Sequence, residues 1–264
     1  MGLDIYSGQL TRYYSRDWET IVQQQSKERG IQCSLTDANG NEIKAVEDKT
    51  ETDQIRERIT EWADNLASKL NPPLPTPLWD ETSECDYYTD KPDWQAFGAL
   101  VLLQACQSLN RPLPEFSENK WEAFDNPIIK EAKDMEIANS LLFGVTLWLP
   151  LPNKALFETL YPTGDKGPIA SIKLLRHELE ELNRQLWNAD ETTILSWRNE
   201  KYYIPYYDPE KQTERKRLFG FIPWKKKKPK EIFRTEELAQ CAFSILYMAV
   251  LFAEQHQVPI LLDF

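Results

Sequence analysis

Helices and strands follow one another in irregular order along this chain, without a repeating strand–helix–strand unit. Helical periodicity or strong apolarity predicts about five helices, over residues 17–29, 51–70, 94–109, 171–189 and 235–255. Some five to seven short strands are predicted around them, including one at each end of the chain. Because a doubly wound fold needs regular alternation, this order favours an α+β fold, with the helices packed on a small mixed sheet. We expect the two terminal strands to pair in that sheet.

The chain of 264 residues predicts a single large globular domain over residues 1–264. Two segments are expected to leave its core. The first is a surface loop over residues 71–93, which starts with the run Asn-Pro-Pro-Leu-Pro-Thr-Pro and continues as an acidic, aromatic stretch. The second is a basic hairpin over residues 208–231.

Local patterns give the remaining elements. Leu3–Tyr14 is rich in aromatic and β-branched residues and predicts one strand, or two strands broken near Gly8. The further expectations are a hairpin over 31–46 with Asn39-Gly40 at its tip, a buried strand over 141–149, a short helix over 153–161, a turn at 163–168 and paired strands over 201–207 and 217–222.

Charge is distributed unevenly along the sequence. Residues 1–135 carry 25 Asp and Glu against 14 Lys and Arg, which accounts for the whole net charge of −11, whereas residues 136–264 carry 17 of each sign. Segregation of this kind bears on partners and on association rates, not on fold.

The acidic charge is densest between Trp79 and Trp94, where aromatic residues interleave with carboxylates. Exposed aromatic side chains among charges are typical of protein-recognition surfaces, although acidic loops are also commonly just solvated. The partner-binding residues predicted here are Trp79, Asp80, Glu81, Glu84, Asp86, Tyr87, Tyr88 and Asp90.

A second candidate site lies in the opening strand. Asp4, Tyr6, Arg12 and Tyr14 are predicted on one polar face, where an arginine fork and flat tyrosine rings suit a bound anion. A structural ion pair across the sheet explains the same residues without any ligand and is the favoured interpretation.

No motif for catalysis, cofactor binding or metal binding stands out. His177 and Glu181 have the i, i+4 spacing that brings an imidazole and a carboxylate together, but a charged, solvated helix face explains the pair better. The four cysteines, Cys33, Cys85, Cys106 and Cys241, are widely spaced and are predicted to be reduced thiols. The sequence therefore predicts no catalytic residues, no metal and no cofactor.

The basic segment Lys211–Lys230 carries nine Lys and Arg with one acid, and includes the run Lys225–Lys228. Such a segment suits phosphates or nucleic acid, but the net acidity of the protein makes nucleic acid an unlikely main partner, and a soluble loop is the favoured interpretation. The sequence opens without a secretory-signal pattern, and its longest apolar run, Cys241–Ala253, is too short to span a bilayer. These features predict a cytoplasmic protein without membrane contact.

Three functional hypotheses follow. The leading one is a cytoplasmic bacterial inhibitor, such as a toxin-neutralising immunity-type protein, that occludes a basic partner protein through the acidic, aromatic segment. The second is a small-molecule hydrolase or transferase, with a polar site built from Asp4, Tyr6, Arg12 and the His177/Glu181 pair. The third is a regulatory subunit that contacts nucleic acid through the basic hairpin.

Overall fold

The computed structural model describes residues 3–31, 35–36, 42–43, 45–46, 48–82, 85–118, 126–198 and 232–263. Six strands form one mixed sheet in the order β4-β1-β10-β6-β8-β7, with β6 and β8 parallel and the other neighbours antiparallel. The strands of this sheet are β1 (Asp4–Ser7), β4 (Tyr88–Asp90), β6 (Leu147–Leu149), β7 (Leu156–Leu160), β8 (Lys166–Ser171) and β10 (Ile260–Asp263). Two short ladders lie outside it and pair β2 (Leu35–Thr36) with β3 (Glu42–Ile43), and β5 (Phe116–Glu118) with β9 (Ile232–Arg234).

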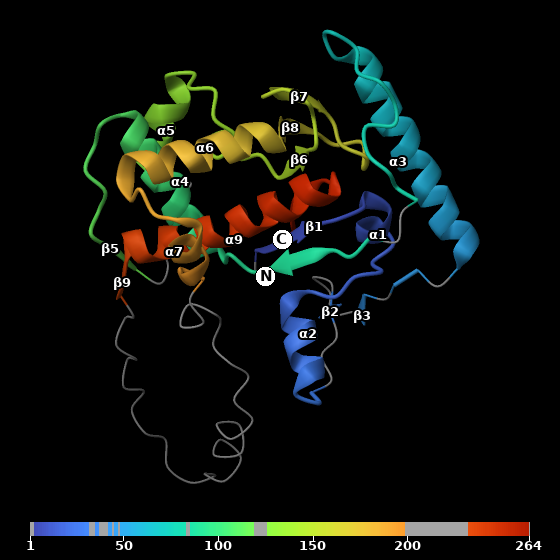
Figure 1. Cartoon of the computed structure of the whole chain (residues 1–264), viewed down its shortest axis with the longest axis horizontal. Coiled ribbons are helices and arrows are strands. Elements are labelled where there is room, and N and C mark those ends of the chain that lie inside the picture. Colours follow the sequence, from blue (N-terminus) through green and yellow to red (C-terminus); the bar gives the residue numbers. More distant parts are fainter. Residues whose placement is uncertain are drawn as a thin grey trace, which may run out of the picture.

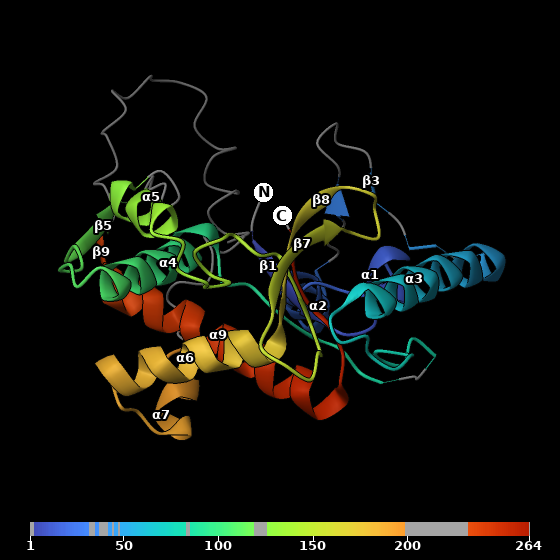
Figure 2. The same ribbon diagram turned by 90° about the horizontal axis from the view of Figure 1, so that it is seen from above.

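Eight helices are described within these ranges. They are α1 (Leu10–Tyr14), α2 (Ile21–Glu28), α3 (Lys49–Lys69), α4 (Trp94–Ser108), α5 (Pro127–Asp134), α6 (Ile172–Leu186), α7 (Glu191–Ser196) and α9 (Thr235–His256). In both views α4, α5, α6, α7 and α9 gather on one side of the molecule, while α3 lies apart at the other end (Figures 1 and 2). The predicted α+β class with a mixed sheet is confirmed, with more helices than the periodicity indicates.

The two ends of the chain meet in the middle of the sheet, as expected. β1 pairs with β10 so that Asp4 lies opposite Asp263 and Tyr6 lies opposite Leu261. β10 in turn pairs with β6. The last strand of the chain is therefore a central strand, and residues from both ends border the same part of the fold.

Alternate residues along the strands belong to two separate hydrophobic cores. Ile5, Trp148 and Leu262 face the core built with α4, α6 and α9, whereas Tyr6 and Leu147 face the core built with α1 and α3. This period-two alternation follows from the pleat, which points successive side chains to opposite faces. The sheet is thus covered on both sides.

The long helices match their predicted positions because their apolar residues recur clearly at helical spacing. In α3, Ile55, Ile59 and Leu66 are buried, while Trp62 is half-buried and donates from Nε1 to the carbonyl oxygen of Leu160 at 2.7 Å. α4 and α9 are apolar nearly all round and pack against one another in the larger core. α9 is long and apolar enough to cross a membrane, but 67% of its most apolar window is buried, as in a core helix of a soluble protein.

The opening of the chain differs from the predicted strand. β1 ends at Ser7, and residues 10–14 form α1, because a carboxylate from a distant segment caps the start of that helix. The next helix starts later than the predicted residue 17, because Thr20 caps α2 through a capping box with Gln23. Gly30 follows this helix in the left-handed conformation, with a φ of +71°.

Two predictions in the middle of the chain are also wrong. Only the end of the apolar run 141–149 is a strand, since Asn139 and Ser140 hold its first residues in a capped turn. The region 153–161 contains strand β7 instead of a helix, because it pairs in register with β8 across the predicted turn at 163–168. The hairpin around 31–46 is confirmed by the pairing of β2 and β3.

The stretch 71–93 is not simply a surface loop. Trp79 and Glu81 are buried, and the stretch ends as strand β4 on the edge of the sheet. It packs inward because its aromatic and carboxylate groups form ring contacts and hydrogen bonds with residues in the N-terminal part of the chain. The predicted hairpin 208–231, the strands 201–207 and 217–222, Asn39-Gly40, Cys33 and Glu84 lie outside the described residues.

Candidate functional site

Glu81 lies in segment 79–82 and its side chain contacts the start of α1. Only 7% of the residue is exposed. Its Oε1 accepts from the backbone N–H of Leu10 at 2.9 Å and from Nε1 of Trp79 at 2.5 Å, and its Oε2 accepts from the N–H of Thr11 at 2.8 Å. The carboxylate therefore supplies the cap that the helix lacks locally. Glu81 is a structural cap, and its predicted role as a steering charge is wrong because both oxygens face the interior.

The predicted aromatic anchors are also used inside the fold. Trp79 is buried with its ring 6.1 Å from that of Trp62. Tyr87 stacks on Tyr6 with ring centroids 5.7 Å apart, and its hydroxyl accepts from the N–H of Glu19 at 2.9 Å. Tyr88 is held by Asp90, to which its hydroxyl donates at 3.2 Å. These rings stabilise the protein's own packing, so an exposed aromatic recognition surface does not form here.

Asp90 forms a buried ion pair instead of a surface charge. It is fully buried, and its Oδ2 lies 2.5 Å from Nε of Arg198. Its Oδ1 accepts from the N–H of Lys91 at 2.7 Å. Burial raises the pKa of Asp90 above its ordinary value, against the opposing effect of Arg198. The pair ties the edge strand β4 to the chain beyond α7.

Of the predicted partner-binding residues that the structure describes, Asp80 and Asp86 are exposed. Oδ1 of Asp80 accepts from both the N–H and the hydroxyl of Thr82, at 2.7 and 2.6 Å, which shapes the turn beside Glu81. Fewer of the described acidic residues in this segment are therefore exposed than the sequence indicates.

The four N-terminal candidates are not gathered around one ligand position. Asp4 faces Lys91, 3.7 Å away, and Asp263 across the sheet. Tyr6 donates from its hydroxyl to the carbonyl oxygen of Gln9 at 2.9 Å. Arg12 donates to the carbonyl oxygen of Cys85 at 2.8 Å and lies over the ring of Tyr87. Tyr14 packs edge-on against Tyr13, with ring centroids 5.1 Å apart. The residues have separate structural partners, but the ion pair of the favoured interpretation differs from the one observed: Asp4 pairs with Lys91, and Arg12 lies on α1 beside Asp17.

The pKa values of this region follow burial. Burial raises the pKa of Asp4; Lys91 lowers it and Asp263 raises it further. Burial also raises the pKa of Tyr6, and that of Tyr14 to about 12. These tyrosines stay protonated at neutral pH, which suits packing and hydrogen bonding rather than proton transfer.

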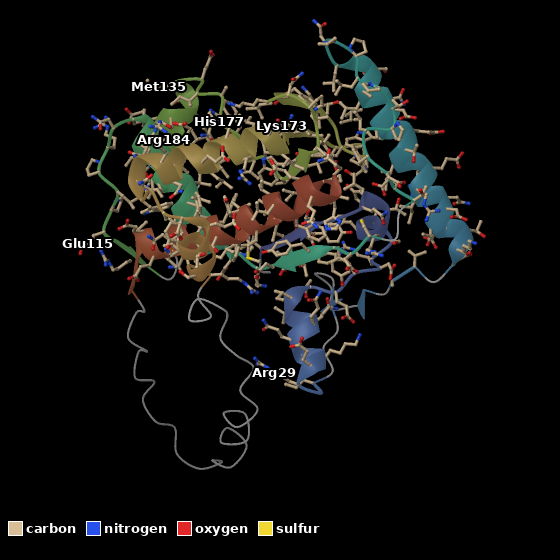
Figure 3. The ribbon with its side chains drawn as sticks, in the orientation of Figure 1. Arg29, Glu115, Met135, Lys173, His177 and Arg184 are labelled. Atoms are coloured by element: carbon tan, nitrogen blue, oxygen red, sulfur yellow. The ribbon has the colours of Figure 1, made fainter. Side chains whose placement is uncertain are left out.

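His177 lies on α6 (Figure 3), and both His177 and Glu181 are half-buried. Arg184 holds the Glu181 carboxylate at 2.5 Å and lowers its pKa. The residue of this helix that sequence reasoning missed is Glu178. It is buried, and its two oxygens accept from the N–H and the hydroxyl of Ser140, both at 2.7 Å. Its position between Leu175 and Leu182 on the inward stripe is the signal that could have revealed it.

A pocket of about 400 Å³ lies between α3 and the chain that follows it. α3 contributes Thr60, Ala63 and Asp64. The opposite wall is formed by Thr76, Pro77, Trp79, Asp80, Glu81 and Thr82. A second pocket of about 280 Å³ lies beside the start of α6 and the end of α9.

The pocket beside α3 is rich in acceptors. Its described lining includes three carboxylates and no basic side chain. Oδ1 of Asp64 is buried and accepts no hydrogen bond from the described residues. Arg56, one turn before Thr60, donates instead to the carbonyl oxygen of Glu81 at 3.3 Å and pairs with Asp53 at 2.7 Å. The arrangement suits a positively charged, donor-only group.

The described residues contain no group of three or more side chains that could hold a metal ion. Cys85, Cys106 and Cys241 are free thiols. Comparisons with protein-family models, curated proteins and solved structures found no match to this chain.

Proposed function

We propose that this protein binds a basic partner protein, and that the acidic pocket beside α3 is the centre of the binding surface. The observation that carries the proposal is the lining of that pocket, which includes Asp64 and Asp80 and no basic side chain among the described residues. A recessed site of negative charge binds a basic group more favourably than the other surfaces of the protein do.

The charge of the whole chain supports the same partner. The net charge of −11 resides in the first half of the sequence, which also supplies the walls of the pocket. An acidic field accelerates the encounter with a basic protein and suppresses binding of acidic ones. Among the described acidic residues of the 79–93 segment, Asp80 and Asp86 are exposed and available for this steering.

The concrete form of the proposal is an inhibitor that occludes a basic functional surface, as an immunity-type protein occludes its toxin. We place it in the cytoplasm, since the free thiols of Cys85, Cys106 and Cys241 suit a reducing compartment.

The test compares three tagged proteins in extracts of the source cell: the parent, Asp80→Lys with Asp86→Lys, and Glu115→Lys with Glu136→Lys. The control pair makes the same charge change at exposed positions outside the pocket, with Glu115 at the opposite end of the molecule from α3 (Figure 3). We expect one basic protein to bind the parent and the control and to be lost by the first variant. With the purified pair, association should slow as salt rises, because charges separated by more than about 8–10 Å are screened.

The proposal fails if the captured protein is acidic, or if all three forms bind it with equal rates. For an enzymatic partner, the inhibitory form further requires that one equivalent of this protein abolishes its activity.

A further inference from the structure

Strand β7 lies at one edge of the main sheet. Among the described strands it pairs with β8 alone, whereas β8 pairs on both sides, with β6 and β7. Figure 1 draws β7 at the rim of the fold, between α6 and α3. An edge strand has a row of main-chain N–H and C=O groups that can pair with a strand of another chain. β7 can therefore extend the sheet wherever its outer groups are open.

Hydrogen bonds at the two ends of β7 show which of its residues face outward. The N–H of Ser171 donates to the carbonyl oxygen of Ala155 at 2.9 Å, and the N–H of Tyr161 donates to that of Asp165 at 2.7 Å. In an antiparallel pair, residues that bond to the neighbouring strand alternate with residues whose main-chain groups point away from it. The even-numbered residues between these two ends therefore turn their main-chain groups away from β8.

The contact with α3 agrees with this assignment and marks how far the edge is covered. The carbonyl oxygen of Leu160 accepts from Nε1 of Trp62 on α3 at 2.7 Å, so this outward group is already used. The main-chain groups of Lys154, Leu156 and Glu158 have no comparable bond with the described part of the chain. Residues 154–158 are therefore the open edge of the sheet.

The side chains of the open edge carry opposite charges around an apolar centre. Lys154 and Glu158 are exposed and flank Leu156 at a spacing of two residues, so the pleat places all three on one face. Leu156 is half-buried against the larger core. Glu158 pairs with Lys166 at 2.8 Å, but both side chains are more than half exposed, and such surface pairs contribute little.

A second copy of the same strand, running antiparallel, matches this pattern. When Leu156 lies opposite Leu156 of the second copy, each Lys154 lies opposite a Glu158, and opposite charges across two strands attract. The register centred on Glu158 instead places two carboxylates opposite each other. It also brings Leu156 opposite Leu160, whose outward carbonyl group is bonded to α3.

The distribution of charge along the chain permits this contact. The net charge of −11 resides in residues 1–135, whereas residues 136–264, which include β7, are neutral overall. Like-charged regions repel when copies of one protein meet. An edge in the neutral half is therefore better suited to self-association than the acidic half is.

We propose that two copies of this protein associate through residues 154–158, antiparallel and centred on Leu156, so that their main sheets join into one continuous sheet. The partner strand supplies acceptors and donors to the outward main-chain groups, and the two pairs of Lys154 with Glu158 fix the register. The contact uses no residue that lines the acidic pocket beside α3, so this inference is independent of the proposed function.

Sedimentation of the full chain over a range of concentrations tests the association. We expect a species of twice the 30.9 kDa chain mass that dissociates on dilution. Glu158→Lys and Lys154→Glu should each raise the dissociation constant of the dimer about tenfold or more, because each sets like charges opposite one another at two places. Combining the two reversals restores opposite charges and should restore the affinity of the parent. Glu115→Lys, a reversal at an exposed site elsewhere, is the control (Figure 3).

Cysteine cross-linking tests the register. In the proposed pairing, the Cα atoms of Lys154 and of Glu158 in the second copy are about 5.5 Å apart, within the reach of a disulfide. Identical positions of the two copies are four residues apart along the strands, about 13 Å, which is beyond that reach. A mixture of Lys154→Cys and Glu158→Cys proteins should therefore form disulfide-linked dimers above the level of the parent under the same oxidant, and neither protein alone should.

Three results would each overturn the inference. They are a monomer at every concentration up to about 1 mM, a dimer whose dissociation constant the single reversals leave unchanged or the combined reversal does not restore, and cross-linking by either cysteine variant alone as readily as by the mixture. Thermal unfolding of each variant checks that it is folded. If a charge reversal is not folded, the mixed cysteine proteins decide the matter.

Discussion

At the scale of single residues, Glu178 is a buried acid that accepts hydrogen bonds from a turn, and its burial disfavours the ionised form of its side chain. With 6% of the residue exposed, burial raises its pKa to about 7, while the donors of Ser140 partly oppose that rise. The folded protein therefore binds the proton more tightly than the unfolded chain does. The stabilising contribution of this protonation is complete below the ordinary pKa of 4.5 and is lost as the pH rises to about 7.

Glu178→Gln should remove this pH dependence. The amide keeps an acceptor for the N–H of Ser140 and cannot ionise, so the variant should gain stability relative to the parent as the pH rises from 4.5 to 7. The gain should be on the order of 2–3 kcal/mol. Urea unfolding of both proteins at several pH values measures it, with Glu180→Gln on the exposed side of α6 as the control. A pH-independent difference between Glu178→Gln and the parent would show that Glu178 ionises freely in the folded state.

At the scale of secondary-structure elements, α1 depends on a residue seventy positions away. Gln9 precedes the helix without a side-chain cap, and the carboxylate of Glu81 takes that role. The same carboxylate accepts from Trp79, which lines the pocket. Helix α1 and the wall of the pocket are therefore joined through the hydrogen bonds of Glu81.

Glu81→Ala should destabilise the protein by at least about 2 kcal/mol, because it leaves buried N–H groups without acceptors. Asp80→Ala, at the exposed neighbour whose Oδ1 accepts from Thr82, should cost less than about 1 kcal/mol. Denaturant unfolding of the two variants gives the comparison. Equal costs would mean that the remote cap contributes nothing.

At the scale of the whole molecule, the sheet joins two cores, and its centre is built from the chain ends and β6. Ile260 on β10 is fully buried between β1 and β6, whereas Leu160 on the edge strand β7 is 55% exposed. Both are aliphatic residues in strands, so they form a matched pair for measuring how much the centre of the sheet contributes.

Ile260→Ala should cost about 2–5 kcal/mol, as large-to-small changes in a core do. Leu160→Ala should cost less than about 0.5 kcal/mol, since it removes an exposed side chain. Thermal or urea unfolding measures both. Similar costs for the two variants would contradict the central position of β10.

Periodicity and turn patterns in the sequence were enough to determine α3, α4, α6 and α9 and the hairpin around 31–46. These features depend on contacts close in sequence or on long apolar stripes, whose burial is required whatever the neighbours are. The pairing of β1 with β10 was also expected, but it joins residues far apart in sequence and depends on tertiary structure. The irregular order of elements likewise determined the α+β class.

Tertiary structure alone decided the rest. α1 is a helix because the carboxylate of Glu81 caps it, and 153–161 contains a strand because it pairs with β8. Trp79 and Asp90 are buried because they pack and bond with other parts of the fold. The partner-binding site predicted in segment 79–90 stays a prediction, and the sequence did not predict the pocket beside α3. The pocket exists because α3 and segment 76–82 enclose Asp64, and a residue's exposure and hydrogen-bond partners depend on neighbours that sequence spacing does not specify.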